Sequence, residues 1–157
     1  MEIERKFLIK DMPDLSKYRS KRLEQGYLNT HPTVRVRRED NEYYLTYKGA
    51  AIDNMAREEY NLPLTEEAYE HLLPKCDGNI IKKTRYLIPI GQNDRGSELV
   101  AELDVFDAPF EGLIFAEVEF PTIEEAKAFD KPEWMGDDVT DNKEYYNSYL
   151  SKKKLDE

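Results

Sequence analysis

Residues 1–10 read M-E-I-E-R-K-F-L-I-K, and charged side chains recur along them at every second position. Glu2, Glu4 and Lys6 share one parity, whereas the apolar Phe7 has the other. A period of two is typical of a β-strand, whose successive side chains point to opposite faces. This stretch therefore predicts a strand with one strongly charged face.

The same period recurs along the chain and predicts seven more strands. They cover residues 21–28, 33–39, 43–49, 57–62, 79–90, 98–106 and 113–121, and turn-forming residues separate most of them. Three other segments have capping residues or apolar spacing typical of helices. They are residues 65–73, 122–129 and 141–153. We expect a mainly β (α+β) fold with eight strands, in one domain that spans residues 1–157, since no repeat or linker interrupts the chain.

The composition narrows the functions that the chain can have. The 157 residues include 33 acidic and 23 basic side chains, for a net charge of -10, which argues against a protein that coats nucleic acid. Cys76 is the single cysteine, so the chain has neither an internal disulfide nor a Cys/His zinc motif. No apolar run approaches the roughly 20 residues of a membrane helix, and the N-terminus lacks the apolar core of a signal peptide. We expect a soluble, cytoplasmic protein that binds no membrane.

Like charges occur in pairs at spacing two, as in E-x-E-x-K, R-x-R, K-x-R, E-x-D and E-x-E. For any one strand, the simpler interpretation is the solvated face of an ordinary antiparallel sheet. Residues two apart in a strand lie about 6.5–7 Å apart on one face, so each pair aims two like charges in one direction. The repetition of such pairs over most strands favours a shared, functional charged face.

The pairs form two sets of opposite charge. The acidic set is Glu2, Glu4, Glu59, Glu102, Asp104, Glu117 and Glu119, and the basic set is Lys6, Arg35, Arg37, Lys48, Arg57, Lys83 and Arg85. Crowded carboxylates raise one another's pKa, and a hard cation such as Mg²⁺ or Mn²⁺ relieves this. Crowded guanidinium groups fit the oxygens of a polyphosphate.

Closing eight strands into a barrel would bring both sets into one lumen. The apolar outer faces would then be covered by the helices or by a second subunit in a homodimer. Divalent metal and fixed cations together suit attack on a chain of phosphates. The sequence has no Gly-rich phosphate loop, and we interpret His31 and His71 as structural or surface residues.

The ordered set of motifs resembles the CYTH superfamily, the triphosphate tunnel metalloenzymes. The matching segments are E-I-E-R-K at 2–6, V-R-V-R at 34–37, Y-K at 47–48, R-E-E-Y-N at 57–61, K-T-R at 83–85, L-D-V-F at 103–106, A-E-V-E-F at 116–120 and D-V-T-D-N-K-E-Y at 138–145. The resemblance implies an eight-stranded antiparallel β-barrel that forms a triphosphate tunnel, with three flanking helices, the last of them C-terminal. It also implies hydrolysis of a triphosphate with Mg²⁺ or Mn²⁺.

The resemblance further implies roles for individual residues. Glu2, Glu4, Lys6 and Lys143 would be catalytic, Lys143 from the C-terminal helix. The acidic set named above would serve the metal, and the basic set would hold phosphates. The fifth strand departs from the family's R-x-E-x-E pattern, because Asn61 stands where the second glutamate is usual.

Several functions remain open at this point. Inorganic tripolyphosphate and a nucleoside triphosphate are the leading substrates, since the tunnel residues contact phosphates and not what is attached to them. A class IV-type adenylyl cyclase would need an adenine pocket, which we do not identify. A thiamine triphosphatase would need an aromatic platform, for which Trp134 and the tyrosines are candidates. A polyphosphate-binding module would keep the basic set and could lose the acids, most of which are present.

Overall fold

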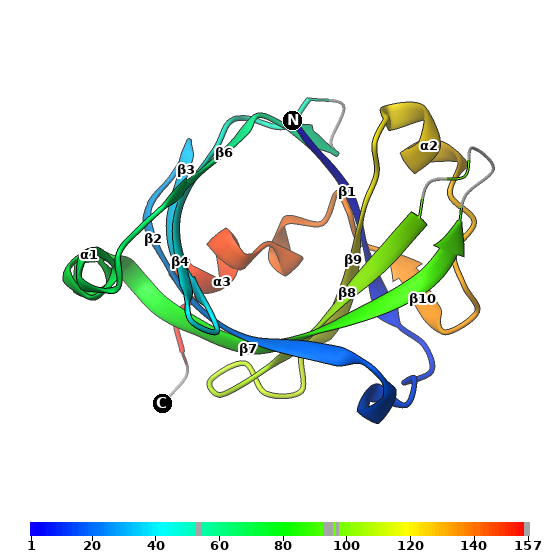
Figure 1. The fold of residues 1–157 in the computed structure, drawn as a ribbon, viewed down its shortest axis with the longest axis horizontal. Helices are drawn as coiled ribbons and strands as arrows, with labels where there is room; N and C mark the ends of the chain where they lie inside the picture. The colour runs from blue at the N-terminus through cyan, green and yellow to red at the C-terminus, as the bar shows by residue number, and fades with distance from the viewer. Residues whose placement is uncertain (53–54, 93–95, 97, 156–157) are drawn as a thin grey trace.

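The computed structural model describes residues 1–52, 55–92, 96 and 98–155. Ten antiparallel strands within these residues form one sheet, which curves into a ring (Figure 1). The strands are β1 (Glu2–Ile9), β2 (Arg19–Thr30), β3 (Thr33–Glu39), β4 (Glu42–Lys48), β5 (Ala56–Arg57), β6 (Glu59–Pro63), β7 (Asp77–Gln92), β8 (Glu98–Phe106), β9 (Ile114–Glu119) and β10 (Met135–Asp138). The neighbour order is β10-β1-β9-β8-β7-β2-β3-β4-β6, with β5 paired to β1.

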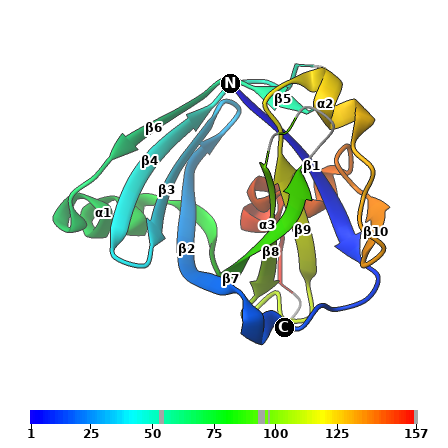
Figure 2. The same cartoon turned by 45° about the vertical axis from the view of Figure 1, so that its right-hand side comes forward.

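The ring is an eight-stranded barrel that is nearly closed. Only Glu58 separates β5 from β6, so the two occupy one position in the ring. β6 pairs with β4, and β5 joins β1 through the pairs Glu2–Arg57 and Ile3–Ala56. The remainder of that edge of β1 is taken by β10 (Figure 2). The expected barrel is thus confirmed, with β10 as an additional strand outside it.

The helices cover the barrel from outside and across one end. They are α1 (Glu66–Leu72), α2 (Ile123–Ala128) and α3 (Asn147–Lys152), with short 3-10 turns η1 (Leu15–Lys17), η2 (Leu73–Lys75) and η3 (Lys143–Tyr145). Thr65 and Thr122 cap α1 and α2 through their hydroxyls, as the sequence predicts. Seen along the barrel, α3 lies across the opening of the ring (Figure 1).

The larger part of the apolar core lies outside the charged lumen. Its larger cluster includes Phe7, Leu103, Val118 and Met135 on the outer faces of strands, with Ala126 of α2 against them. A second cluster joins Ile81, Phe106 and Phe115 to Leu150 of α3 on the inner side of the barrel, since these strand residues share the parity of Lys83, Asp104 and Glu117. Alternation along the strands therefore separates an apolar outer face, buried under helices, from an inner face that is charged around the pocket and apolar where it meets α3.

Two segments differ from the sequence expectation. Residues 141–153 do not form one helix, because the extended backbone of Tyr146 (φ -78, ψ 136) separates η3 from α3. Residues 135–138, for which the sequence predicts no element, form β10 against β1. Gly136 permits this approach, since a Cβ there would lie 3.3 Å from the carbonyl oxygen of Leu8. Within the described residues, none of the helices has the length and apolar character that a membrane crossing needs.

Candidate active site

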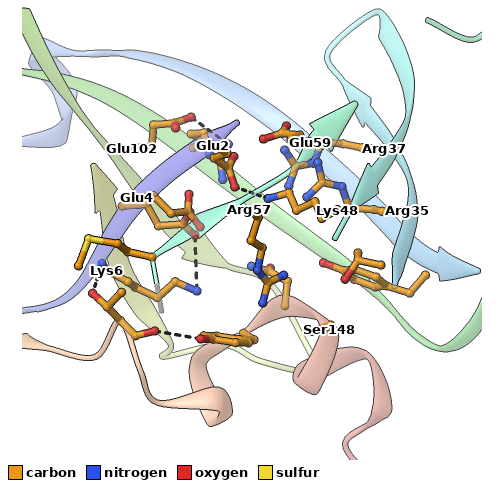
Figure 3. Close-up of a pocket in the computed structure, with 18 residues that line it drawn as sticks. Glu2, Glu4, Lys6, Arg35, Arg37, Lys48, Arg57, Glu59, Glu102 and Ser148 are labelled. Atoms are coloured by element: carbon orange, nitrogen blue, oxygen red, sulfur yellow. Dashed lines mark hydrogen bonds and ion pairs between the residues drawn. The ribbon is translucent and has the colours of Figure 1, made fainter. Parts of the chain in front are cut away.

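The inner faces of the strands line one pocket inside the barrel. The predicted site residues along its wall are Glu2, Glu4, Lys6, Arg35, Arg37, Lys48, Arg57, Glu59, Arg85, Glu102 and Glu117. Side chains that the sequence analysis did not select complete the wall: Tyr27, Thr33, Met55, Thr140, Tyr146, Asn147 and Ser148. Glu2 and Glu4 enter the pocket from one side, and Arg35 and Arg37 face them from the other (Figure 3).

Arg35 and Arg37 on β3 are buried cations whose hydrogen-bond partners in the described structure are neutral. The Nε of Arg37 donates to Oε1 of Gln25 at 2.8 Å, and a terminal nitrogen of Arg35 lies 3.4 Å from the Thr46 hydroxyl. The Nε of Arg35 is buried without a hydrogen-bond partner in the described structure. Burial, together with Arg35 and Arg85 nearby, lowers the pKa of Arg37 to about 10. This pair therefore favours an incoming anion.

Arg57 and Lys6 meet the same aromatic ring at the end of the pocket next to α3. The Arg57 guanidinium carbon lies 5.4 Å from the Tyr146 ring centroid, and Lys6 Nζ is also 5.4 Å from it. Lys6 donates to the carbonyl oxygen of Tyr145 at 2.7 Å and lies 3.6 Å from a Glu117 oxygen. These contacts hold both cations beside the pocket.

Other inward cations are neutralised by carboxylates. Lys48 pairs with Glu2 at 2.7 Å, which lowers the pKa of Glu2 although burial opposes this. Arg85 donates to both oxygens of Asp104, at 2.8 and 3.0 Å, and to Glu102 at 2.9 Å. Burial disfavours the charge on Arg85, but Asp104 and Glu102 outweigh it and raise the Arg85 pKa well above its usual value.

Glu4, which is half-buried, and Glu117, which is buried, are adjacent carboxyls whose pKa values shift in opposite directions. Burial, with the charges of Glu117 and Glu2, raises the pKa of Glu4 well above its usual value. Burial also opposes ionisation of Glu117, but Lys6 prevails and holds the Glu117 pKa well below its usual range. A divalent cation at Glu4 would relieve this repulsion and keep Glu4 ionised.

The departure at Asn61 has a structural consequence. Asn61 accepts a hydrogen bond from the Thr46 hydroxyl at 2.6 Å and donates one to Glu59 at 2.9 Å. A carboxylate at this position could accept the first bond but would repel Glu59 instead of donating to it. Arg57 and Glu59 line the pocket whereas Glu58 is exposed, so the register with Arg57 inward is the one observed.

Four predicted site residues lie outside the pocket wall. Lys83 and Asp104 are fully buried behind it and form an ion pair of 2.8 Å. Burial lowers the pKa of Lys83 to about 7, although Asp104 opposes this. Glu119 is exposed at the end of β9, and Lys143 is exposed at the start of η3, so the C-terminal segment does not bring Lys143 to the pocket.

The pocket fits a metal that is bound jointly with substrate. Across the described part of the chain, no three Asp, Glu, His or Cys side chains are arranged to hold an ion alone. Mg²⁺ commonly uses one or two carboxylates together with substrate phosphates, and does not need a cage made only of protein ligands. The paired carboxyls of Glu4 and Glu117, with Glu2 close by, supply such oxygen ligands.

Comparison with known families agrees with this geometry. The family model described as the CYTH domain matches residues 1–154. The chain belongs to the CYTH family. Among curated CYTH relatives, an inorganic triphosphatase of Nitrosomonas europaea is 38% identical over 156 residues, covering 96% of both chains. An inorganic triphosphatase of Acetivibrio thermocellus is 35% identical, covering 96% of this chain and 93% of its own.

Solved structures support the CYTH fold. A crystal structure of an inorganic triphosphatase matches with a TM-score of 0.66 and 36% identity, covering 96% of this chain and 94% of that one. A putative adenylate cyclase from Bacillus halodurans matches with a TM-score of 0.52 and 14% identity, a similarity that concerns the fold alone.

Tyr27 and Thr33 could have been selected from the sequence. Thr33 has the same parity as Arg35 and Arg37, and Tyr27 lies directly across from Arg35 on the predicted neighbouring strand. Thr140 and Tyr146–Ser148 could not, since they belong to short turns and a short helix without a period that points to a face.

Proposed function

We propose that this protein is a metal-dependent triphosphatase whose substrate is inorganic tripolyphosphate. The observation that carries the proposal is the buried arginine pair of β3, with an unpartnered Arg35 Nε, in a pocket that also holds carboxyls. A chain of phosphates supplies several anionic oxygens at once, which matches cations arranged on different strands. The names of the CYTH relatives point to the same substrate class.

Basic and acidic residues have different roles in the proposed site. Arg35, Arg37 and Arg57 bind phosphoryl oxygens and offset the negative charge that develops on the leaving phosphate. Glu2, Glu4 and Glu117 provide the oxygen ligands for Mg²⁺ or Mn²⁺, which would polarise a phosphoryl oxygen when bound. Lys6, held between Glu117 and the Tyr145 carbonyl, places one more positive charge beside the same space.

The lining favours an inorganic substrate over one with an organic group. Tyr27 and Tyr146 are the aromatic residues of the described pocket wall, and both are engaged. The Tyr27 hydroxyl accepts from Gln25 at 3.1 Å, and the Tyr146 ring faces Arg57 and Lys6. Trp134, a candidate platform for thiamine, packs against the outer apolar core instead. Tyr27 is buried in the apolar cluster with Ile81, Phe106 and Phe115, and cations lie over the Tyr146 ring, which disfavours stacking of an adenine or thiamine ring on either tyrosine.

A phosphate-release panel tests the proposal. Tripolyphosphate, ATP, thiamine triphosphate and pyrophosphate are each incubated with Mg²⁺, Mn²⁺ or Ca²⁺, and the ATP products are examined for cyclic AMP. We expect tripolyphosphate to have the highest kcat/KM, activity to disappear in a chelator, and no cyclic AMP to form. Faster release from ATP or thiamine triphosphate would reject the inorganic substrate. Binding of tripolyphosphate without turnover under any metal would indicate a polyphosphate-binding module.

A further inference from the structure

Asn147 is a pocket residue with one half of its side chain already fixed. It is the first residue of α3, and it borders the pocket beside Tyr146 and Ser148. Its Oδ1 accepts a hydrogen bond of 3.0 Å from Lys83 Nζ. The described residues offer no hydrogen-bond partner to its Nδ2, and this nitrogen is not fully buried. The amide donor is therefore accessible from the pocket and available.

Lys83 determines the orientation of the Asn147 side-chain amide. An ammonium has three donors and no acceptor, so the amide must turn its oxygen, and not its NH₂, toward Nζ. Lys83 has no freedom to move, because its side chain is 0% exposed and its Nζ lies 2.8 Å from the equally buried Asp104. Lys83 lies behind the pocket wall while Asn147 lines it. The oxygen therefore faces away from the pocket, and Nδ2 faces toward it.

The backbone that carries Asn147 is held just as firmly. Gly78 on β7 has φ +70, and a Cβ there would lie 1.9 Å from the carbonyl oxygen of Ser151, so α3 is in close backbone contact with β7. Asn79 donates to the carbonyl oxygens of Leu150 at 3.0 Å and Lys153 at 2.7 Å. Strand β7 thus anchors both ends of α3, through Asn79 at one end and Lys83 at the other.

We propose that Asn147 is a substrate-binding residue that donates its Nδ2 to a phosphoryl oxygen of tripolyphosphate, and that Lys83 is a positioning residue for it. The inference rests on the proposed function, since it concerns the same pocket. A neutral donor at this end adds a directional bond next to Arg57 and Lys6, whose charges alone do not fix the orientation of a phosphoryl group. Lys83 then acts through Asn147, without contacting phosphate itself.

Two substitutions of Asn147 separate this role from a purely structural one. Asn147→Asp keeps an oxygen for Lys83 but turns a carboxylate toward the phosphate, whereas Asn147→Ala removes both groups. If Nδ2 binds phosphate, Asp raises KM for tripolyphosphate by roughly tenfold or more and Ala raises it about threefold, with kcat changed less in both. If Asn147 only anchors α3, Ala leaves KM unchanged and lowers only the stability, whereas Asp raises KM in either case through its charge.

Thermal unfolding and calorimetry give readouts besides turnover. We expect the Asp variant to unfold at or above the wild-type temperature and the Ala variant below it, since Ala loses the bond to Lys83. Calorimetric titration with tripolyphosphate should show the weakest binding for the Asp variant. The matched control is Asn142→Asp, which adds the same charge at an exposed position and keeps an oxygen for the Glu144 amide.

The outcomes distinguish the two proposals. Wild-type turnover with equal KM values for wild type and Asn147→Ala would overturn the role of Asn147 and leave the triphosphatase intact. A wild type that binds tripolyphosphate without hydrolysing it would overturn the proposed function, and the calorimetric affinity of Asn147→Ala would still decide the role of Asn147. A wild type that does not bind tripolyphosphate would overturn both.

Discussion

Strands β3 and β7 carry the same motif, two cations at spacing two, yet the fold treats the two pairs differently. On β7, Lys83 and Arg85 face β8, where Asp104 lies directly across from Arg85. On β3, Arg35 and Arg37 are flanked by β2 and β4, which place Gln25, Tyr27, Thr46 and Tyr44 across from them. The cations of β7 are neutralised within the protein, whereas those of β3 form no ion pair among the described residues.

The difference shows that a charged motif acquires its role from the neighbouring strand. Burying a cation without a counter-charge destabilises the folded state, and Arg35 and Arg37 on β3 are buried in this way. The lowered pKa of Arg37, to about 10, and the raised pKa of Arg85 are the two signs of this difference. Bound triphosphate would supply at β3 what Asp104 and Glu102 supply at β7.

The largest expected effect comes from Arg85→Ala. Removing one partner of a buried ion pair leaves Asp104 with Lys83 alone, and we expect the free energy of unfolding to fall by about 3 kcal/mol. Denaturant unfolding measures this. Arg35→Ala is the comparison, because it removes a buried charge without a carboxylate partner and should cost little or even stabilise the protein. Equal losses in the two variants would remove the distinction between the strands.

Arg37→Ala should strongly lower the activity without destabilising the fold. We expect kcat/KM for tripolyphosphate to fall by about a hundredfold, or about 2.7 kcal/mol of transition-state stabilisation, with the unfolding midpoint kept. Arg37→Lys should lose less, since it keeps the charge but not the guanidinium fork. Glu42→Ala, at an exposed position on the next strand, is the control. Similar effects at Arg37 and Glu42 would mean that β3 presents only a solvated face.

Glu4→Gln probes the acidic side of the same pocket. Loss of one carboxylate ligand should lower activity at least tenfold, which is about 1.4 kcal/mol of barrier, even at saturating metal. Stability should be unchanged or higher, because the repulsion between Glu4 and Glu117 is gone. Steady-state rates over a Mg²⁺ series measure the first effect, with the exposed Glu58→Gln as control. Wild-type turnover in Glu4→Gln would exclude Glu4 from the site.

The smallest effect belongs to a partly exposed pair on the outside of the barrel. Arg5 donates to Asp138 at 2.7 Å, and hydrogen bonds from Thr140 and Arg5 outweigh burial and lower the Asp138 pKa. A lowered pKa stabilises the fold above the unfolded value of about 3.9, and this contribution disappears as pH falls through the folded value. Asp138→Asn should therefore cost less than about 1 kcal/mol at pH 7. The difference from wild type should vanish near pH 2 in acid-unfolding curves, and a constant difference would contradict it.

The sequence predicts the strands and their charged faces, but it does not predict which strands are neighbours or the position of Asn147. Alternation in Glu2–Lys6 and Arg35–Arg37 gives the strands and their charged faces, because parity is local. It does not reveal that β7 lies between β8 and β2 whereas β3 lies between β2 and β4, so it cannot tell which cations are neutralised. Asn147 was missed because its place depends on the long-range contact between α3 and Gly78.

The most direct test of the difference between β3 and β7 is the thermal unfolding of wild type and of an Arg35→Gln, Arg37→Gln variant during titration with tripolyphosphate. A chelator keeps metal out, and sodium chloride of equal ionic strength serves as the blank. A ligand that binds only the folded state raises the unfolding midpoint progressively with its concentration. We predict a rising midpoint for wild type and none beyond the salt blank for the variant. Equal shifts in both proteins would contradict the assignment of the triphosphate site to the arginines of β3.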